Sequence, residues 1–233
     1  MRRRLTRRAA GIGIGILLTL ILLFFLSGCT TLALYDPAAG DTIRAAAADG
    51  SLNEVQRRLL YGAQQVLGTQ RLSVNGLKYP ADCTGTIQAI YAFAGIDLRT
   101  PMAGYSGNGV TRLNSYLKER GLLYSTSLPS PGDLVFWDDT YDRNGDGLWN
   151  DPLTHVGMVV AVSDEGTISY VHHNYRKGIV LARMNLIKPD TVTEGETELN
   201  SAMRMRDGNI YPRWLSSHLY RELGKGWKLD RAG

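Results

Sequence analysis

Cysteine is scarce in this sequence, since only Cys29 and Cys83 occur among the 233 residues. In an exported protein, two cysteines would ordinarily suggest one disulfide. Cys29, however, ends the segment "LSGC", which has the form of a lipobox, where the cysteine is lipidated. If Cys29 carries lipid, Cys83 has no partner. An unpaired thiol in an oxidising compartment indicates a chemical role.

Residues 1–28 have the composition of a bacterial export signal. The segment "MRRRLTRR" carries five arginines, and residues 9–26 form an apolar run. We therefore expect a signal peptide over 1–28, a lipid anchor on Cys29 and a location in the cell envelope. Thr30 after the cysteine favours the outer membrane, facing the periplasm, if the cell is Gram-negative. An uncleaved membrane helix is the alternative, because the run approaches the length that spans a bilayer.

An excess of positive charge is missing from the rest of the chain. The sequence has 26 Lys+Arg and 22 Asp+Glu, and five of the arginines lie in the first eight residues. The 21 basic and 22 acidic side chains that remain give a net charge of about −1. No basic patch is left that would argue for binding to nucleic acid. The sequence also shows no internal repeat.

The remaining chain predicts a tether and one α+β domain. Residues 29–50 are rich in alanine and small residues, which favours a tether. Residues 51–233 are expected to form the domain, with a C-terminal extension over about 185–233. Its first half predicts three helices: one capped by Ser51 and Glu54, one over about 82–95 and one over 110–120. Its second half predicts the strands "DLVFW", "HVGMVVAVS", "TISYVHH" and "GIVLARM", and the short segments "DEG" and "NYRKG" between the last three predict hairpins.

Cys83 lies where a loop becomes a helix, in "YPADCTGTIQAIYAFAG". Asp82 is the expected N-cap, and the start of a helix carries unpaired N–H groups and a partial positive charge. Both favour the thiolate, lower the cysteine pKa and offer a donor to an oxyanion. We expect Gly85 to leave room for a substrate near the helix start. The alternative is a buried structural cysteine.

A cysteine nucleophile needs a base, and His155 begins a predicted strand where its ring can reach the sheet's rim. His172 lies near the end of the next strand, and a polar group there would orient the imidazole of His155. His172 and His173 fall on opposite faces of that strand, and periodicity does not choose between them. His218 is expected at the surface, on a late helix in "YPRWLSSHLYREL".

Four motifs in order, "DCTG", "PGDLVFW", "HVGMVV" and "YVHH", resemble those of the NlpC family of bacterial cell-wall cysteine peptidases and of the related CHAP amidases. The resemblance covers roughly residues 55–184. It implies a papain-like α+β fold, with helices packed on an antiparallel sheet and the nucleophile at a helix N-terminus. It also implies Cys83 as nucleophile, His155 as base and His172 as the orienting residue. His173 or Asn174 could replace His172.

The resemblance implies a hydrolase that cleaves amide bonds in the stem peptides of peptidoglycan through a thioester, with no required cofactor. The alternatives are an N-acetylmuramoyl-L-alanine amidase, an acyltransferase on the same fold, or a non-catalytic wall-binding lipoprotein. The family's aromatic-Gly-Gly segment is replaced by "RLSVNGLKYPA". Asp82 and Tyr79 are therefore our candidates for substrate binding, with Tyr105 as an alternative to Tyr79.

The segment "DDTYDRNGDGLWND" matches the first half of a calcium-binding loop. The candidate ligands are Asp142, Asn144, Asp146, Leu148 through its carbonyl, and Asp151, with Asn150 as an alternative to the last. Position twelve of the loop is Leu153 instead of the usual glutamate. A turn rich in Asp and Asn that needs no metal is the alternative. A bound calcium would brace the loop that leads into His155.

Overall fold

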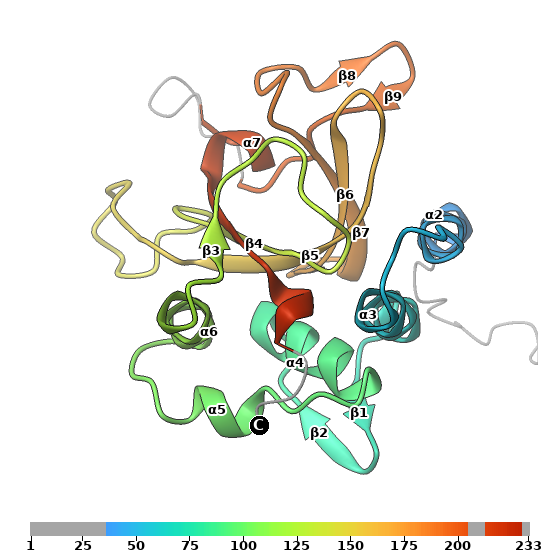
Figure 1. The fold of residues 1–233 in the computed structure, drawn as a ribbon. Coiled ribbons are helices and arrows are strands. Elements are labelled where there is room, and N and C mark those ends of the chain that lie inside the picture. Colours follow the sequence, from blue (N-terminus) through green and yellow to red (C-terminus); the bar gives the residue numbers. More distant parts are fainter. Residues whose placement is uncertain (1–35, 205–212, 230–233) are drawn as a thin grey trace, which may run out of the picture. The chain divides into compact units, whose positions relative to one another are not determined.

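The computed structural model describes residues 36–204 and 213–229 (Figure 1). The predicted signal peptide and the lipidated Cys29 lie outside these residues. Within the two described ranges, no helix is both long and apolar enough to cross a bilayer.

Six antiparallel strands form the central sheet, in the order β3-β10-β4-β5-β6-β7 (Figure 1). Their bounds are β3 Leu123–Tyr124, β10 Tyr220–Gly224, β4 Leu134–Trp137, β5 His155–Val162, β6 Thr167–Asn174 and β7 Gly178–Asn185. Strands β4 to β7 pair in the order in which they follow along the chain. The β5–β6 and β6–β7 connections are the predicted short hairpin turns, whereas residues 138–154 form a long loop between β4 and β5. The prediction of an α+β fold with an antiparallel sheet is confirmed.

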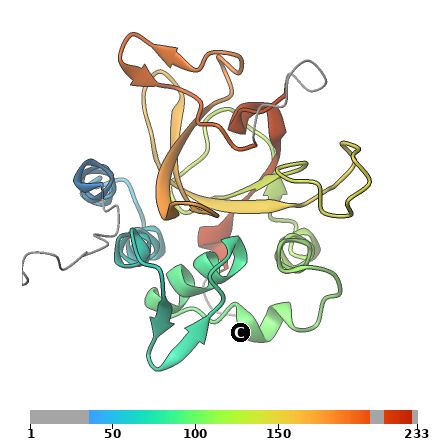
Figure 2. The ribbon, with the colours of Figure 1, turned by 180° about the vertical axis from the view of Figure 1, so that it is seen from behind.

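Three helices cover one face of this sheet (Figures 1 and 2). They are α3 (Glu54–Val66), α4 (Cys83–Phe93) and α6 (Gly109–Glu119). A hydrophobic core lies between these helices and the sheet. Because side chains alternate along a strand, Leu134 and Phe136 of β4 and Val156 of β5 point into it. Two smaller elements connect α3, α4 and α6: the hairpin of β1 (Leu72–Val74) and β2 (Leu77–Tyr79), and the short helix α5 (Arg99–Met102).

A second core lies on the opposite face of the sheet. Trp137, Tyr170 and Leu219 are buried there. The elements on this side are α7 (Ser216–Leu219) and the hairpin of β8 (Thr193–Glu194) and β9 (Thr197–Glu198) (Figure 1). The chain ends its described part in a short 3-10 helix, η1 (Gly226–Lys228). Because both faces of β4 are covered, all four of its residues are buried.

The predicted tether over 29–50 is partly wrong. Helix α2 (Pro37–Ala47) lies within it, begins at the N-cap Asp36 and buries Ala39 and Ile43 in the helix-side core. Its alanines, which suggested a linker, are small enough to let the helix lie close to its neighbours. This part of the chain therefore belongs to the packed domain.

The start of α3 also differs from the prediction. Asn53, and not Ser51, is the N-cap, and its side chain accepts a hydrogen bond from the Gln56 N–H at 2.9 Å. The Gln56 side chain completes the capping box by accepting from the Asn53 N–H at 3.0 Å. The Ser51 N–H instead donates to Asp49 in the preceding turn. Both Ser51–Glu54 and Asn53–Gln56 have the residue types and spacing of a capping box. Only the Asn53–Gln56 pair lies at the first turn of the helix.

The predicted late helix is wrong over most of its length. Helix α7 has only four residues, and the chain continues as β10, which lies between β3 and β4 in the sheet. The hydrogen bonds that β10 forms with β3 and with β4 outweigh the helical preference of its amphipathic pattern, because such a preference is weak by itself. The predicted C-terminal extension thus supplies a strand of the central sheet.

Candidate active site

The start of α4 is built tightly around Asp82 and Gly85. The Asp82 side chain accepts a hydrogen bond from the Gly85 N–H at 2.7 Å and caps the helix whose first residue is Cys83. A Cβ atom at Gly85 would lie 2.0 Å from the carbonyl oxygen of Pro80. The space beside Gly85 is therefore filled by the chain that leads into Cys83. Our expectation that it leaves room for substrate is wrong.

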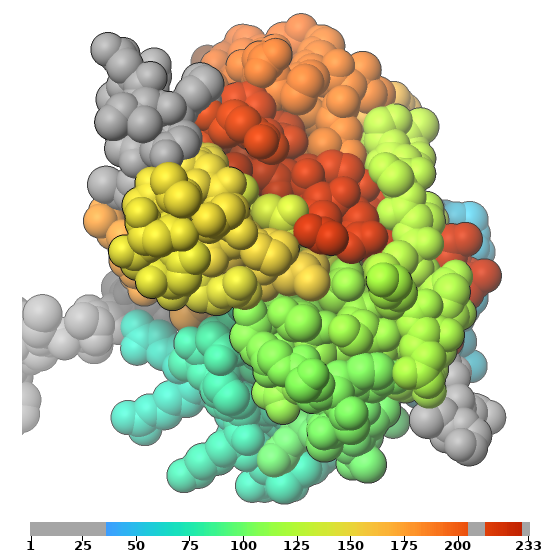
Figure 3. All heavy atoms as spheres, turned by 90° about the vertical axis from the view of Figure 1, so that its left-hand side faces the viewer, coloured from blue at the N-terminus to red at the C-terminus, as the bar shows by residue number. Residues whose placement is uncertain are grey.

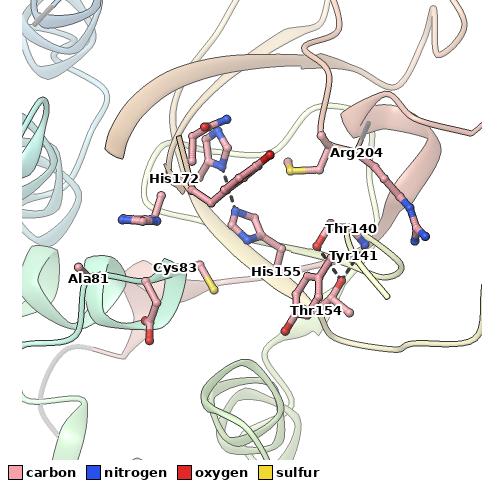
Figure 4. A pocket seen from close by; sticks show the side chains of 13 residues that line it. Ala81, Cys83, Thr140, Tyr141, Thr154, His155, His172 and Arg204 are labelled. Atoms are coloured by element: carbon pink, nitrogen blue, oxygen red, sulfur yellow. Dashed lines mark hydrogen bonds between the residues drawn. The ribbon is translucent and has the colours of Figure 1, made fainter. Parts of the chain in front are cut away.

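His155 and His172 meet on the face of the sheet away from the helices. The distance between Nε2 of His155 and Nδ1 of His172 is 2.9 Å, and the ring planes are 82° apart (Figure 4). His173 alternates to the other face of β6, and the Asn174 side-chain oxygen accepts from two N–H groups in the following turn. Of the three residues that the sequence left open, His172 is the one placed against His155.

Aromatic side chains hold this histidine pair in place. The Trp137 ring centroid lies 5.8 Å from that of His155 and 4.9 Å from that of Tyr170, which in turn lies 5.3 Å from His172. Gly157 leaves room for the Trp137 ring, because a Cβ atom there would lie 3.2 Å from it. The glycine of "HVG" thus allows the Trp137 ring to pack closely behind the histidines.

A cleft of about 630 Å³ opens over Cys83 and His155. Figure 4 shows the sulfur of Cys83 directed toward the His155 ring, while the dashed hydrogen bond to His172 leaves from another side of that ring. The walls come from residues 81–83, the β4–β5 loop (residues 138–154), residues 172–175 of β6 and its turn, and Met203 with Arg204. The cleft thus joins four segments that are distant in sequence.

The thiol and both imidazoles are neutral at pH 7 in the resting site. Burial raises the pKa of Cys83 to about 11, and the Asp82 charge adds to this, against weaker lowering by hydrogen bonds from Val156 and Thr84. Burial also lowers the pKa of His155 to about 4 and that of His172 well below its usual value. The expectation of a lowered cysteine pKa is wrong here, because desolvation outweighs the helix terminus.

Asp82 lines the cleft as predicted for a substrate-binding residue, but Tyr79 does not. The Tyr79 ring lies 5.7 Å from the guanidinium of Arg99, outside the cleft. The Tyr105 hydroxyl donates to Glu119 at 2.7 Å and is also outside it. His218 is half-buried, and its Nε2 lies 2.9 Å from a carboxylate oxygen of Asp190.

The sequence analysis did not predict that Tyr141, Met203 and Arg204 line the cleft. Tyr141 stands in the loop that we considered only for calcium. Met203 and Arg204 belong to no recognisable sequence motif. They line the cleft because the chain passes beside it again after β7. Figure 3 shows the β4–β5 loop, in yellow, beside the C-terminal segment, in red. The Asp138 N–H joins the two by donating to the Leu219 carbonyl at 3.1 Å.

The segment predicted to bind calcium forms a compact turn. Its carboxylates accept hydrogen bonds from N–H groups of the same loop. Asp142 accepts from the N–H groups of Gly145 and Gly147, and Asp146 accepts from that of Leu148. Asp151, which is 2 % exposed, accepts from the Arg143 N–H at 2.8 Å. Over residues 36–204 and 213–229, no group of three His, Cys, Asp or Glu is arranged to hold a metal. Calcium stays a prediction.

Comparison with known proteins supports the reading of the motifs. The family model of the CHAP domain matches residues 73–174, which run from β1 to β6 and include Cys83, His155 and His172. No curated protein matches the chain. CHAP domains are typically hydrolases that act on peptidoglycan. The match of residues 73–174 to the CHAP domain is consistent with the superfamily of cell-wall amidases and peptidases of the CHAP and NlpC types.

Proposed function

We propose that this protein is a cysteine hydrolase that cleaves amide bonds within the stem peptides of peptidoglycan, as an endopeptidase. The observation that supports it most strongly is the placement of Cys83 beside His155, with His172 hydrogen-bonded to the other side of the imidazole (Figure 4). This is the nucleophile, base and orienting group that covalent catalysis requires.

The first step is attack of the Cys83 sulfur on the carbonyl carbon of the amide. Because the resting pair is a neutral thiol and a neutral imidazole, His155 takes the thiol proton as the S–C bond forms. Nδ1 of His155 is the acceptor, since Nε2 is engaged with His172. Nε2 of His155 therefore carries the hydrogen that is donated to Nδ1 of His172. His172 thus fixes the tautomer of the base.

The start of α4 offers donors for the oxyanion that forms in this step. The N–H groups of Gly85 and Thr86 donate to Asp82. The N–H group of Cys83 makes no hydrogen bond within the described part of the chain, and it belongs to the positively polarised first turn. The backbone of Thr84, the next residue of that turn, hydrogen-bonds the Cys83 sulfur. A backbone N–H beside the attacking sulfur is well suited to an oxyanion.

Collapse of the intermediate breaks the C–N bond. The imidazolium of His155 gives its proton to the leaving amine, and a thioester remains on Cys83. Water then attacks the thioester, with His155 again accepting a proton, and the thiol leaves. The carboxylate of Asp82, beside the nucleophile, is available to an amine of the substrate.

The test is digestion of purified peptidoglycan by the wild type and by Cys83→Ser, with fragments identified by mass. We expect wild-type fragments cut within the stem peptide and a loss of activity on the order of 10⁴-fold or more in the variant. Equal release of the same fragments by both proteins would rule out the cysteine mechanism. Muramic acid with a free carboxyl group would identify an amidase, and binding without fragments would identify a wall-binding protein.

We also propose that a lipid on Cys29 holds the domain in the cell envelope, at the outer membrane. The support is the lipobox sequence, and an anchor would keep the enzyme against its insoluble substrate. Metabolic labelling with a radioactive fatty acid tests this: Cys29→Ala should lose the label, whereas retained label would contradict it.

A further inference from the structure

Two tyrosines stand at the catalytic cleft with much of their surface in solvent. Tyr141, from the β4–β5 loop, is 50 % exposed, and Tyr175, from the β6–β7 turn, is 76 % exposed. Of the exposed large apolar side chains in the described residues, these are the two that line this cleft. Single exposed apolar residues are common on proteins, but two aromatic rings at one cleft suggest contact with a ligand.

The charges of the cleft limit what that ligand can be. Among the described residues, no lysine lines it, and Arg204 is the only arginine that does. The Arg204 guanidinium lies 4.0 Å from the Trp149 ring centroid and donates to the Asp139 carbonyl at 2.7 Å. Figure 4 shows this side chain directed away from His155. Arg176 is not a lining residue, and its guanidinium lies 5.1 Å from the centroid of the Tyr175 ring. Among the described residues that line the cleft, a carboxylate-bearing group would meet Asp82 and no unpaired cation, so this lining favours an uncharged ligand.

A polar donor accompanies the two rings. The Asn174 side-chain oxygen accepts from the N–H groups of Arg176 and Lys177, at 3.0 and 3.1 Å, which fixes the orientation of the amide. Its Nδ2 makes no hydrogen bond within residues 36–204 and 213–229, and Asn174 lines the cleft. An N–H donor held in this way suits an acetamido or hydroxyl oxygen.

We propose that Tyr141 and Tyr175 form a subsite for an N-acetylated sugar ring of the glycan strand, next to Cys83. Such a ring is uncharged, has one apolar face of C–H bonds that attracts the negative face of an aromatic ring, and has polar edges. This inference rests on the proposed function and deepens it. The enzyme then prefers stem peptides that are still attached to glycan over free peptides.

Binding is measured on the full-length chain carrying Cys83→Ala, so that nothing is cleaved. The probes are an uncharged tetrasaccharide of N-acetylglucosamine and, separately, a sugar-free stem peptide. Tyr141→Ala and Tyr175→Ala should each raise the Kd for the tetrasaccharide about 3- to 10-fold, and the Kd for the peptide by less than about twofold. Tyr141→Phe and Tyr175→Phe keep the ring and should retain most of the affinity.

The matched control is Tyr61→Ala, because Tyr61 is 55 % exposed but lies on α3, outside the cleft. It should leave both Kd values unchanged. No binding of the tetrasaccharide, or equal weakening for both probes, would overturn the subsite. If the wild type cleaves no peptidoglycan while tetrasaccharide binding still depends on both tyrosines, the hydrolase proposal fails and the sugar subsite stands.

Discussion

Nδ1 of His172 lies 2.9 Å from Nε2 of His155, although the two residues are 17 positions apart and on different strands. The register that pairs β5 with β6 brings them together, and both face away from the helices. A hydrogen bond on Nε2 leaves the Nδ1 side of His155 for the thiol of Cys83. The relationship makes His172 a positioning residue for the proposed base.

Loss of His172 should impair catalysis with little effect on substrate binding. We expect His172→Ala to lower kcat on the order of 10²-fold with KM nearly unchanged, because His155 loses the acceptor that fixes its tautomer. His172→Asn, whose amide oxygen can accept the same hydrogen, should recover part of kcat. His218→Asn is the control, because His218 lies outside the cleft. An equal loss in His172→Asn and His172→Ala would contradict the role of the acceptor.

The pH dependence follows from the lowered pKa of His155. Its neutral form is the base, and burial lowers its pKa to about 4, so the active form persists well below pH 6.5. We expect kcat/KM to stay level as the pH falls from 7 to about 5 and to decline through about 4. A profile of initial rates on a soluble muropeptide measures this. An acid limb centred near 6.5 would show that the imidazole is not desolvated in the free enzyme.

The charge and the capping role of Asp82 can be separated. Asp82→Asn removes the charge that raises the Cys83 pKa but keeps an oxygen for the Gly85 N–H, so alkylation of Cys83 at neutral pH should become faster. Asp82→Ala removes both and should also cost about 1 kcal/mol of stability. Iodoacetamide rates and thermal melts measure the two effects. Unchanged alkylation in Asp82→Asn would mean that the carboxylate does not act on the thiol.

Gly85 should not tolerate a side chain. Gly85→Ala places a Cβ atom 2.0 Å from the Pro80 carbonyl oxygen, which is backbone and cannot move without shifting the segment before Cys83. We expect a loss of about 1–3 kcal/mol in the free energy of unfolding, measured in urea. Gly50→Ala is the control, because nothing lies within 4 Å of its Cβ position. Similar stability of the two variants would contradict the close contact with Pro80.

Calcium remains a proposal for the loop that contains Asp142 and Asp146. If it binds, calcium should raise the Tm of the wild type, and Asp142→Ala and Asp146→Ala should abolish that rise. Both variants should also lose some stability in a chelator, because each carboxylate accepts backbone hydrogen bonds. Asp164→Ala, at an exposed hairpin turn, is the control. No shift of the wild-type Tm by calcium would reject the site.

Much of the local structure was predictable from short patterns. The cap at Asp82, the helix that starts at Cys83 and the four strands from "DLVFW" to "GIVLARM" lie where the sequence indicated. Each depends on interactions within a few residues, such as a capping side chain or the alternation of apolar residues. The start of α3 was misplaced by two residues, because two candidate caps stand side by side.

The sequence by itself determined which residues can do chemistry here: a cysteine at a helix start and histidines on the neighbouring strands. Only the tertiary structure decided that His172 faces His155, that burial raises the pKa of Cys83, and that Tyr141 and Met203 line the cleft. Chemical type and local capping are properties of adjacent residues. Strand register and desolvation depend on segments that are far apart in the chain and meet only when it folds.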